Sequence, residues 1–341
     1  MFDNFHGNEA AAATLRRMID EDRIAQTLLL DGPTGIGKAT LARRFAQVLL
    51  DHPEKIEADD LSLDHNRDVI AEREKWPSEK RSDDPLLFST HPDFITFCPE
   101  GPLRQISIQQ MRVLKERAQY KPLKGKWRIF LIDQLDRANI QAADSVLKTL
   151  EEPPEHLILF LTAENPYDLP PTIRSRSIAF HLTPLSIDEM EAFVRTRKLE
   201  DADRRIALAG GCPGLAVTLD LAVHQKRRAL LMAMLEAASG QANFVEWVRQ
   251  SESFLQSKSE KLDGYFKLLY SLLEDLLTLQ SGGYRLLHSD LREPLGKLAG
   301  RITFDWLQAA VQQVDEMVSL QRRNVQKGLM VDRFVVTQRS R

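Results

Sequence analysis

A glycine-rich loop is the first segment of this chain whose residues could do chemistry. The run GPTGIGK, over 32–38, follows the short apolar segment 27–30 and precedes a helix-forming stretch over 39–50. Between a strand and a helix, glycines let backbone N–H groups converge on phosphate oxygens, and the helix start adds partial positive charge. Lys38 would place a point charge at the outer phosphates. We interpret the run as a nucleotide-binding P-loop, with a chance Gly-rich turn as the alternative.

The metal ligand of such a loop is altered. The full motif has Ser or Thr directly after the lysine, where it ligates magnesium, but position 39 is alanine and Thr40 comes one residue late. One residue along a helix turns a side chain by about 100°, so Thr40 is no simple substitute. ATP or ADP could still bind, but Mg²⁺ loses one ligand and its binding is in doubt. The cofactor-binding residues that we predict are Gly32, Pro33, Thr34, Gly35, Ile36, Gly37, Lys38, Ala39, Thr40 and Asp133.

Asp133 belongs to a second nucleotide element. It follows the apolar run 128–132, and an apolar strand that ends in Asp is where P-loop enzymes place an outer magnesium contact. The next residue is Gln134, whose amide is not a base at neutral pH and cannot activate water. Asp133 therefore has two interpretations, a metal contact or a carboxylate that only caps the end of the strand.

The elements around these residues alternate between strand-like and helix-like segments. Segments 27–30 and 93–97 are strand-like, and 128–132 and 157–161 are continuous apolar runs, which are typical of strands covered on both faces. Between the last two runs, apolar residues over 143–150 share one helical face. We predict an α/β fold with a parallel sheet flanked by helices.

Composition limits the class of protein. The 341 residues suggest two or three domains, and the formal net charge of −3 argues against a broad basic surface for nucleic acid. Two cysteines, Cys98 and Cys212, exclude a disulfide scaffold and suit a reducing cytoplasm. The chain contains no apolar run of about 20 residues and no basic-then-apolar leader. We expect a cytoplasmic multidomain protein.

The second half changes character. The stretch from 51 to about 84 is charge-dense and predicts a surface insertion that is partly mobile, whereas strand patterns stop at about residue 224. Apolar stripes then predict helices buried between several neighbours. One stripe consists of Leu262, Phe266, Leu269, Leu273 and Leu276, widened by Leu268, Leu272 and Leu277, and another of Leu307, Ala310, Val311, Val314 and Val318.

Motifs along nearly the whole chain resemble one known family. They are Gly7-Asn8-Glu9, GPTGIGKATLA over 32–42, His91-Pro92-Asp93, LKTLEEPP over 147–154, IRSRS over 173–177 and LQRRN over 320–324. LKTLEEPP followed some twenty residues later by a Ser-Arg pair is specific to clamp loader subunits. The set resembles the delta-prime subunits of bacterial DNA polymerase III clamp loaders, which are AAA+ proteins.

This resemblance implies three domains and a set of partners. The domains are a RecA-like P-loop domain over 1–184 with a charged insertion at about 51–90, a helical lid over 185–223, and a helical collar for oligomerisation over 224–341. The implied partners are the tau/gamma motor subunits and the delta subunit, with the sliding clamp and primer–template DNA contacted through the complex and no membrane. The implied location is the cytoplasm.

The resemblance also assigns an arginine finger. In the family, a Ser-Arg-Cys motif places its arginine in the ATP site of the neighbouring subunit. Here 175–177 is Ser-Arg-Ser, so the finger would be Arg176, with Arg174 as the competing candidate. A guanidinium on the γ-phosphate in trans is worth roughly 10³–10⁵ in rate.

Other family residues are missing. The sensor 1 threonine is absent from TAENP over 162–166, and the sensor 2 arginine is absent from GCPGL over 211–215. With Ala39 and Gln134, four parts of the hydrolytic machinery are altered. We expect no ATP hydrolysis by this chain, and nucleotide binding stays open.

Zinc and direct DNA contact are not expected. Many family members carry a four-cysteine zinc module after the P-loop helix, but 50–90 has no cysteine, and His52 and His65 cannot complete a tetrahedral site. Basic clusters at 121–128, 225–228 and 322–327 are solvated faces by default, with DNA contact as the alternative.

Three hypotheses result. The first is a catalytically silent scaffold subunit of the clamp loader that gives Arg176 to a neighbour and helps to load the clamp on primed DNA. The second is an active AAA+ motor subunit of the tau/gamma kind, which Ala39 and Gln134 oppose. The third is a small-molecule P-loop kinase, which the helical second half opposes.

Overall fold

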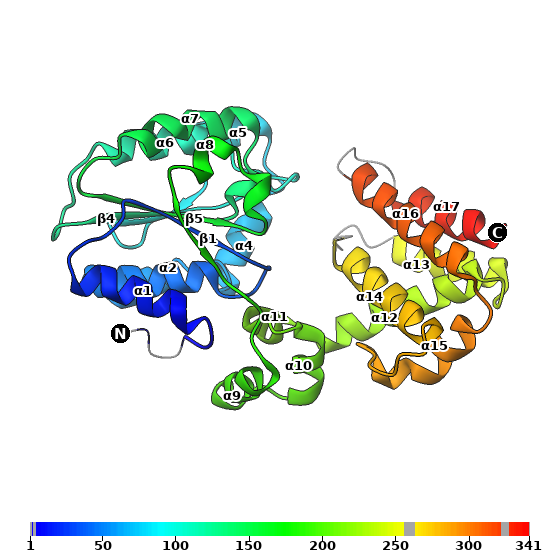
Figure 1. Ribbon diagram of the computed structural model, residues 1–341. Helices are drawn as coiled ribbons and strands as arrows, with labels where there is room; N and C mark the ends of the chain where they lie inside the picture. The colour runs from blue at the N-terminus through cyan, green and yellow to red at the C-terminus, as the bar shows by residue number, and fades with distance from the viewer. Residues whose placement is uncertain (1, 3–4, 256–262, 322–326, 341) are drawn as a thin grey trace. The chain divides into compact units, whose positions relative to one another are not determined.

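The chain forms two compact units, Met1–Thr218 and Leu219–Arg341. The computed structural model describes residue 2 and residues 5–255, 263–321 and 327–340. Figure 1 shows a sheet flanked by helices in the first unit and helices in the second. The predicted α/β fold with a helical C-terminal part is confirmed. The separate lid domain over 185–223 stays a prediction, since residues up to 218 belong to the first unit.

The first unit is built from strands and helices that alternate along the chain. Its elements are α1 (Glu9–Asp20), β1 (Thr27–Asp31), α2 (Lys38–Leu49), α3 (Pro53–Glu57), α4 (Asp64–Arg73), α5 (Ser78–Asp83), β2 (Leu87–Phe88), β3 (Phe94–Phe97), α6 (Ile108–Ala118), β4 (Arg128–Ile132), η1 (Leu135–Arg137), α7 (Ile140–Glu151), β5 (Leu157–Ala163), η2 (Pro166–Asp168), α8 (Pro171–Arg174), β6 (Ile178–His181), α9 (Ile187–Arg197), α10 (Ala202–Ala209) and α11 (Pro213–Thr218).

The strands form one six-stranded sheet in the order β2-β3-β4-β5-β1-β6. Every neighbouring pair is parallel except β2 and β3. Every residue of β1, β4 and β5 is buried, as their continuous apolar runs predict. The register places Asp31 of β1 opposite Ala163 of β5 and His181 of β6, so the residues after these three strands meet at one edge.

Alternate residues of β1 contribute to two cores. Leu28 and Leu30 pack in the cluster that contains Phe45 of α2, whereas Leu29 packs in the cluster that contains Val146 of α7. Figure 1 accordingly shows α1 and α2 on one face of the sheet, and α6 and α7 on the other. Burial on both faces holds the central strands in place, and with them the loops at their ends.

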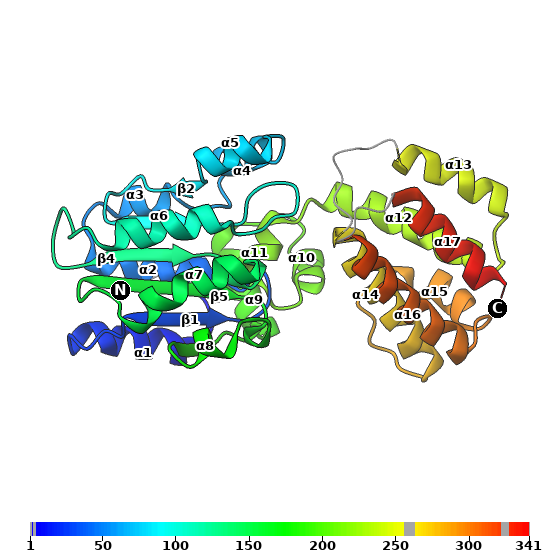
Figure 2. The ribbon, with the colours of Figure 1, turned by 90° about the horizontal axis from the view of Figure 1, so that it is seen from above.

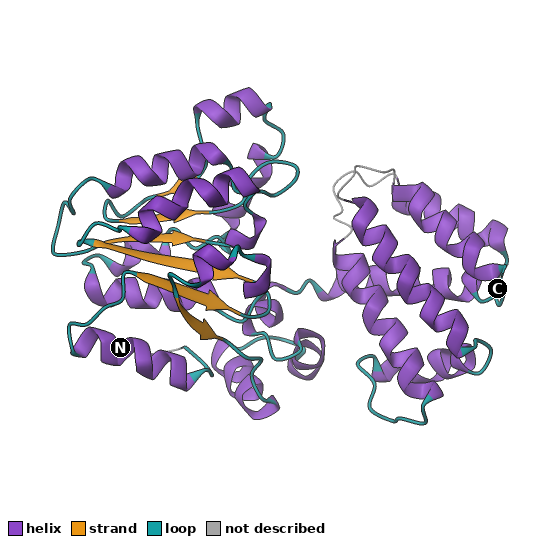
Figure 3. Cartoon of the chain, turned by 45° about the horizontal axis from the view of Figure 1, so that its top comes forward, coloured by secondary structure: helices purple, strands orange, loops and turns teal. Residues whose placement is uncertain are grey.

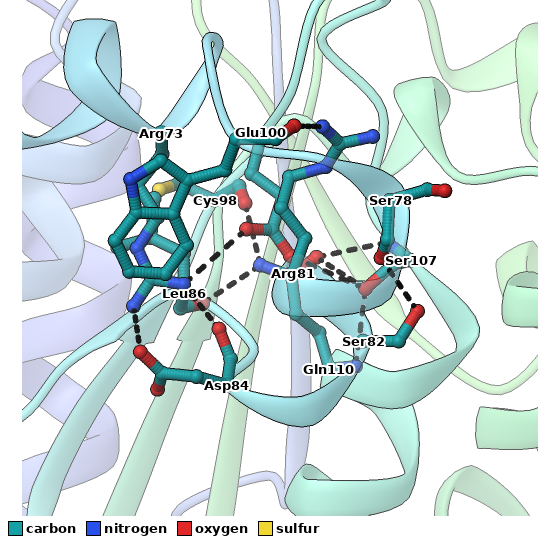
Figure 4. A network of polar contacts seen from close by, with 11 residues as sticks. Arg73, Ser78, Arg81, Ser82, Asp84, Leu86, Cys98, Glu100, Ser107 and Gln110 are labelled. Atoms are coloured by element: carbon teal, nitrogen blue, oxygen red, sulfur yellow. Dashed lines mark hydrogen bonds and ion pairs between the residues drawn. The ribbon is translucent and has the colours of Figure 1, made fainter.

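The charged insertion is helical. Helices α3, α4 and α5 lie beside β2 at the edge of the sheet (Figure 2). Polar contacts fasten this insertion, as Figure 4 shows: Arg73 Nη2 lies 2.9 Å from Asp84 Oδ2, and Gln110 Nε2 donates to the carbonyls of Leu86 (2.7 Å) and Cys98 (2.8 Å). Side-chain hydrogen bonds and an ion pair thus fasten the insertion to the β2 side of the sheet.

Within the described ranges, no group of three His, Cys, Asp or Glu side chains is arranged to hold a metal.

The second unit is helical where the structure describes it (Figure 3). Its elements are α12 (Leu221–Ala238), α13 (Phe244–Leu255), α14 (Asp263–Gln280), η3 (Ser289–Leu291), α15 (Arg292–Ala299), α16 (Phe304–Gln321) and α17 (Lys327–Arg339). The core contains most of the two predicted stripes. None of the helices in the described ranges is long and apolar enough to cross a membrane.

Two details of the predicted stripes are wrong. Leu277 of α14 is 42% exposed and Val311 of α16 is 37% exposed, so neither helix is buried around its whole circumference. Both residues lie at the margin of their stripe, where the helix surface turns toward solvent. Leu262, most of the basic cluster 322–327 and the motif residues 322–324 lie outside the described residues.

Candidate functional site

The phosphate loop connects β1 to α2, as the sequence predicts. Gly32 has φ +138°, and a Cβ there would lie 2.3 Å from the Leu182 carbonyl oxygen, so no larger residue fits. Gly37 precedes α2 with φ +105°, a conformation that side chains other than glycine rarely adopt. Ile36 is buried in the core and fixes the middle of the loop by packing. The glycines are therefore required by the backbone path.

Lys38 is turned back onto its own loop. Its Nζ donates to the carbonyl oxygens of Gly32 (2.5 Å) and Pro33 (3.0 Å). Burial lowers the pKa of Lys38, and the negative charges of Asp133, Glu164 and Asp136 oppose that shift. The charges of three carboxylates thus act on the ammonium group, while its hydrogen-bond acceptors among the described residues are the backbone oxygens of Gly32 and Pro33.

Three parts of the chain close on the loop from outside. The backbone N–H of Gly214, in α11, donates to the Gly35 carbonyl at 2.7 Å. The Thr34 hydroxyl donates to a carboxylate oxygen of Glu164, which directly follows β5. The Phe5 ring lies over Gly37, where an added Cβ would be 3.2 Å from Cε2 of the ring. The Gly35 carbonyl and the Thr34 hydroxyl of the loop are thereby engaged within the chain, and Phe5 covers Gly37.

The two positions after the lysine do not supply a hydroxyl to the loop. Ala39 is half-buried and packs against the apolar core below the sheet. The Thr40 hydroxyl accepts a hydrogen bond from Arg43 Nη2 at 3.5 Å, one turn along α2. The Thr40 hydroxyl is thus engaged within α2, and its failure to replace the missing ligand stays a prediction.

Asp133 is held by protein donors. The Thr162 hydroxyl donates to Asp133 Oδ1 at 2.7 Å and accepts from the backbone N–H of Gln134 at 2.8 Å. The Gln134 side-chain amide donates to Asp133 Oδ2 at 3.4 Å. These contacts give Asp133 a structural role at the end of β4, and the metal contact stays a prediction.

Arg176 lies at the opposite end of the strands, where β1 and β6 begin. It precedes β6, whereas the phosphate loop follows β1, and the two strands run parallel with Leu28 opposite Ile178. At about 3.3 Å per residue, the five residues of β1 span roughly 16 Å from one end of the strand to the other. Arg176 is therefore too far away to reach the loop of its own chain.

The LKTLEEPP and SRS motifs meet in space. Arg176 Nη2 lies 2.7 Å from Glu151 Oε1, at the C-terminal end of α7, and Arg176 Nη1 donates to the Thr172 carbonyl at 2.9 Å. The Arg176 side chain keeps 34% of its surface exposed. The competing candidate, Arg174, instead lies over the Tyr167 ring at 5.0 Å. Arg176 is thus the arginine that α7 orients at this edge.

Sequence reasoning missed three residues of these sites. Glu164 and Gly214 contact the loop, and Glu151 pairs with Arg176. Glu164 had a usable signal, because it directly follows an apolar run beside the predicted P-loop strand. Gly214 lies in the GCPGL run that was considered only for a missing sensor arginine, and its own contact depends on how α11 packs.

Fold and site together define a class: an α/β unit with a glycine-rich P-loop segment and a mostly parallel sheet, followed in the chain by a unit that is helical in its described residues. A family model described as "DNA polymerase III, delta subunit" matches residues 7–186, more than half of the chain. The chain belongs to this family, and its resemblance to clamp-loader AAA+ subunits is confirmed.

Curated relatives include subunits of two kinds. The delta' subunit of Pseudomonas aeruginosa is 29% identical over 195 residues, which are 55% of this chain and 54% of that protein. The tau subunit of Escherichia coli is 27% identical over 190 residues, 55% of this chain and 26% of that protein. The match thus covers about half of the first relative's length and about a quarter of the second's. Since both kinds are similar to the chain, the choice of role depends on the site itself.

One solved structure aligns with nearly the full length of this chain. A gamma-subunit-related protein of DNA polymerase III from Thermotoga maritima aligns with 97% of this chain and 99% of its own, at 19% identity and a TM-score of 0.45.

Proposed function

We propose that the chain is a non-hydrolysing scaffold, or stator, subunit of the DNA polymerase III clamp loader, which gives Arg176 in trans to the ATP site of a neighbouring subunit. The observation that carries this proposal is the position of Arg176. It lies at the end of the strands opposite the chain's own phosphate loop, and about a third of its side-chain surface is exposed there. A guanidinium so placed cannot reach the loop of its own chain, so any γ-phosphate that it contacts belongs to a second subunit.

Three features support the absence of hydrolysis. Ala39 offers no magnesium ligand, and Gln134 offers no base, because an amide does not accept a proton at neutral pH. The helix that would bring a sensor arginine to the phosphates has Gly214 directly on the loop, where a Cβ would lie 2.8 Å from the Gly35 carbonyl oxygen. A side chain at this position would have no space in this arrangement.

In this role the chain has partners in the cytoplasm. The tau/gamma motor subunits and the delta subunit would form a ring with it through the 224–341 collar, and the ring would load the sliding clamp on primed DNA. The alternative is an active motor subunit like the tau relatives, to which the chain is similarly related. Lys38, at the loop, and Arg176, at the far edge, separate the two functions experimentally.

The test is the steady-state ATPase of the reconstituted loader with clamp and primed DNA. Arg176→Ala is expected to slow the neighbouring site by roughly 10³–10⁵-fold, with ring assembly unchanged by gel filtration. Arg174→Ala is the matched control, because its guanidinium lies over Tyr167, and it should leave the rate unchanged. Lys38→Ala should also have little effect.

Two results would contradict the proposal. The finger assignment is wrong if the intact ring with Arg176→Ala turns over ATP at the wild-type rate. The stator role is wrong if the isolated chain hydrolyses ATP and Lys38→Ala abolishes that activity, in which case the chain is a motor subunit.

A further inference from the structure

Glu164 is placed beside the phosphate loop by the backbone of the sheet. The parallel register pairs Asp31 of β1 with Ala163 of β5, so the next residues along the two strands, Gly32 and Glu164, emerge side by side. The backbone N–H of Glu164 donates to Asp136 Oδ2 at 3.4 Å, which holds this turn at the same edge. Because strand pairing sets this position, it does not depend on the side-chain rotamer.

The carboxylate of Glu164 is directed at the loop. It accepts the hydroxyl proton of Thr34, the residue in the middle of the GPTG turn. Its negative charge also acts on Lys38, whose pKa it raises against the effect of burial. Glu164 is thus an anion that binds a side chain of the loop and acts electrostatically on the loop lysine, and in both respects it resembles a bound phosphate group.

The charge balance at the loop is unfavourable for a second anion. The charges of Glu164, Asp133 and Asp136 all act on Lys38, so three negative charges stand against one positive charge in the surroundings of the loop. Magnesium bound between nucleotide and protein would offset such charge, but Ala39 provides no ligand for it. Each added phosphate would therefore meet net negative charge near the outer end of the loop.

We infer that Glu164 is the residue that keeps nucleoside di- and triphosphates out of this loop, because its carboxylate binds Thr34 of the loop and places a negative charge in the field of Lys38. The inference extends the proposed catalytic silence by naming what excludes the nucleotide. It predicts that the loop keeps the backbone of a phosphate site and regains binding when this one charge is removed.

Isothermal titration of the full chain with ADP, and separately with ATP and magnesium, tests the inference. Glu164→Gln keeps the size of the side chain and removes its charge, and its Kd for each nucleotide should fall by about tenfold or more, equivalent to about 1.4 kcal/mol. Glu155→Gln is the matched control, since Glu155 is exposed in the turn before β5, at the opposite edge. Its Kd should equal that of the wild type.

A double variant shows where the gained nucleotide binds. Adding Lys38→Ala to Glu164→Gln should abolish the gain, because the ammonium is the cation of the loop. Equal affinities of wild type and Glu164→Gln, whether both bind or both are silent, would overturn the inference. So would a gain that Glu155→Gln shares or that survives Lys38→Ala. None of these outcomes affects Arg176, so the stator proposal is judged by the ATPase assay alone.

Discussion

Gly214→Ala is the sharpest test of the contact between α11 and the phosphate loop. In a helix, alanine is favoured over glycine by up to about 1 kcal/mol, so a substitution into open space would stabilise the protein. At Gly214, however, the added Cβ would lie 2.8 Å from the Gly35 oxygen and 3.1 Å from its Cα. These are backbone atoms, and the helix or the loop must move to make room.

The expected effect is a net destabilisation. Overpacking of this kind costs about 1–3 kcal/mol, and subtracting a helix-propensity gain of about 1 kcal/mol leaves a loss of up to about 2 kcal/mol. For a unit of this size, 1 kcal/mol corresponds to about 2–4 °C in Tm. We expect the melting transition of the 1–218 unit to fall by up to about 8 °C.

The chain contains a matched control for this substitution. Gly296 lies in α15 of the second unit, and an added Cβ there meets no atom within 4 Å. Gly296→Ala should therefore raise the transition of its own unit, by up to about 1 kcal/mol. Differential scanning calorimetry of the full chain measures both variants, and the opposite signs also assign the transitions. If Gly214→Ala stabilises the protein as Gly296→Ala does, then α11 does not rest on the loop and our account of the closed site fails.

Two further predictions concern buried polar groups. Burial lowers the pKa of His288, whose Nε2 lies 2.9 Å from the Ser271 hydroxyl. Between the lowered pKa in the folded state and the unfolded value of about 6.5, the unfolded state binds more protons than the folded state. The Tm of the second unit should therefore fall as the pH drops below about 6.5. A Tm that stays constant from pH 7.5 to 5.5, or a His288→Gln variant whose Tm depends on pH as steeply as that of the wild type, would contradict this. Gln110→Ala removes the amide that donates to two backbone carbonyls, so urea unfolding should show a loss of about 2–4 kcal/mol in the free energy of unfolding. The control Gln109→Ala, at the neighbouring position, should cost under about 0.5 kcal/mol. Equal losses for the two variants would show that these buried hydrogen bonds contribute nothing.

Part of the fold was predictable because its signals are local. A buried strand needs a continuous apolar run, and a P-loop needs glycines between a strand and a helix, so neighbouring residues encode both. The helices of the charged insertion were not predicted as such, because α4 has few apolar residues and depends on polar contacts such as Arg73 with Asp84. The exposure of Leu277 and Val311 was also missed, since the edge of a helical stripe depends on the neighbouring helices.

The sequence by itself determined the glycine-rich loop between a strand and a helix, the α/β class, the alanine that follows the loop lysine and the family resemblance. Only the tertiary structure decided what those residues contact. Thr34 and Glu164 are 130 positions apart, and their contact follows from the register of β1 and β5. The packing of α11 on the loop and the pairing of Glu151 with Arg176 likewise join distant segments. Such contacts depend on strand order and helix packing, which no short stretch of sequence specifies.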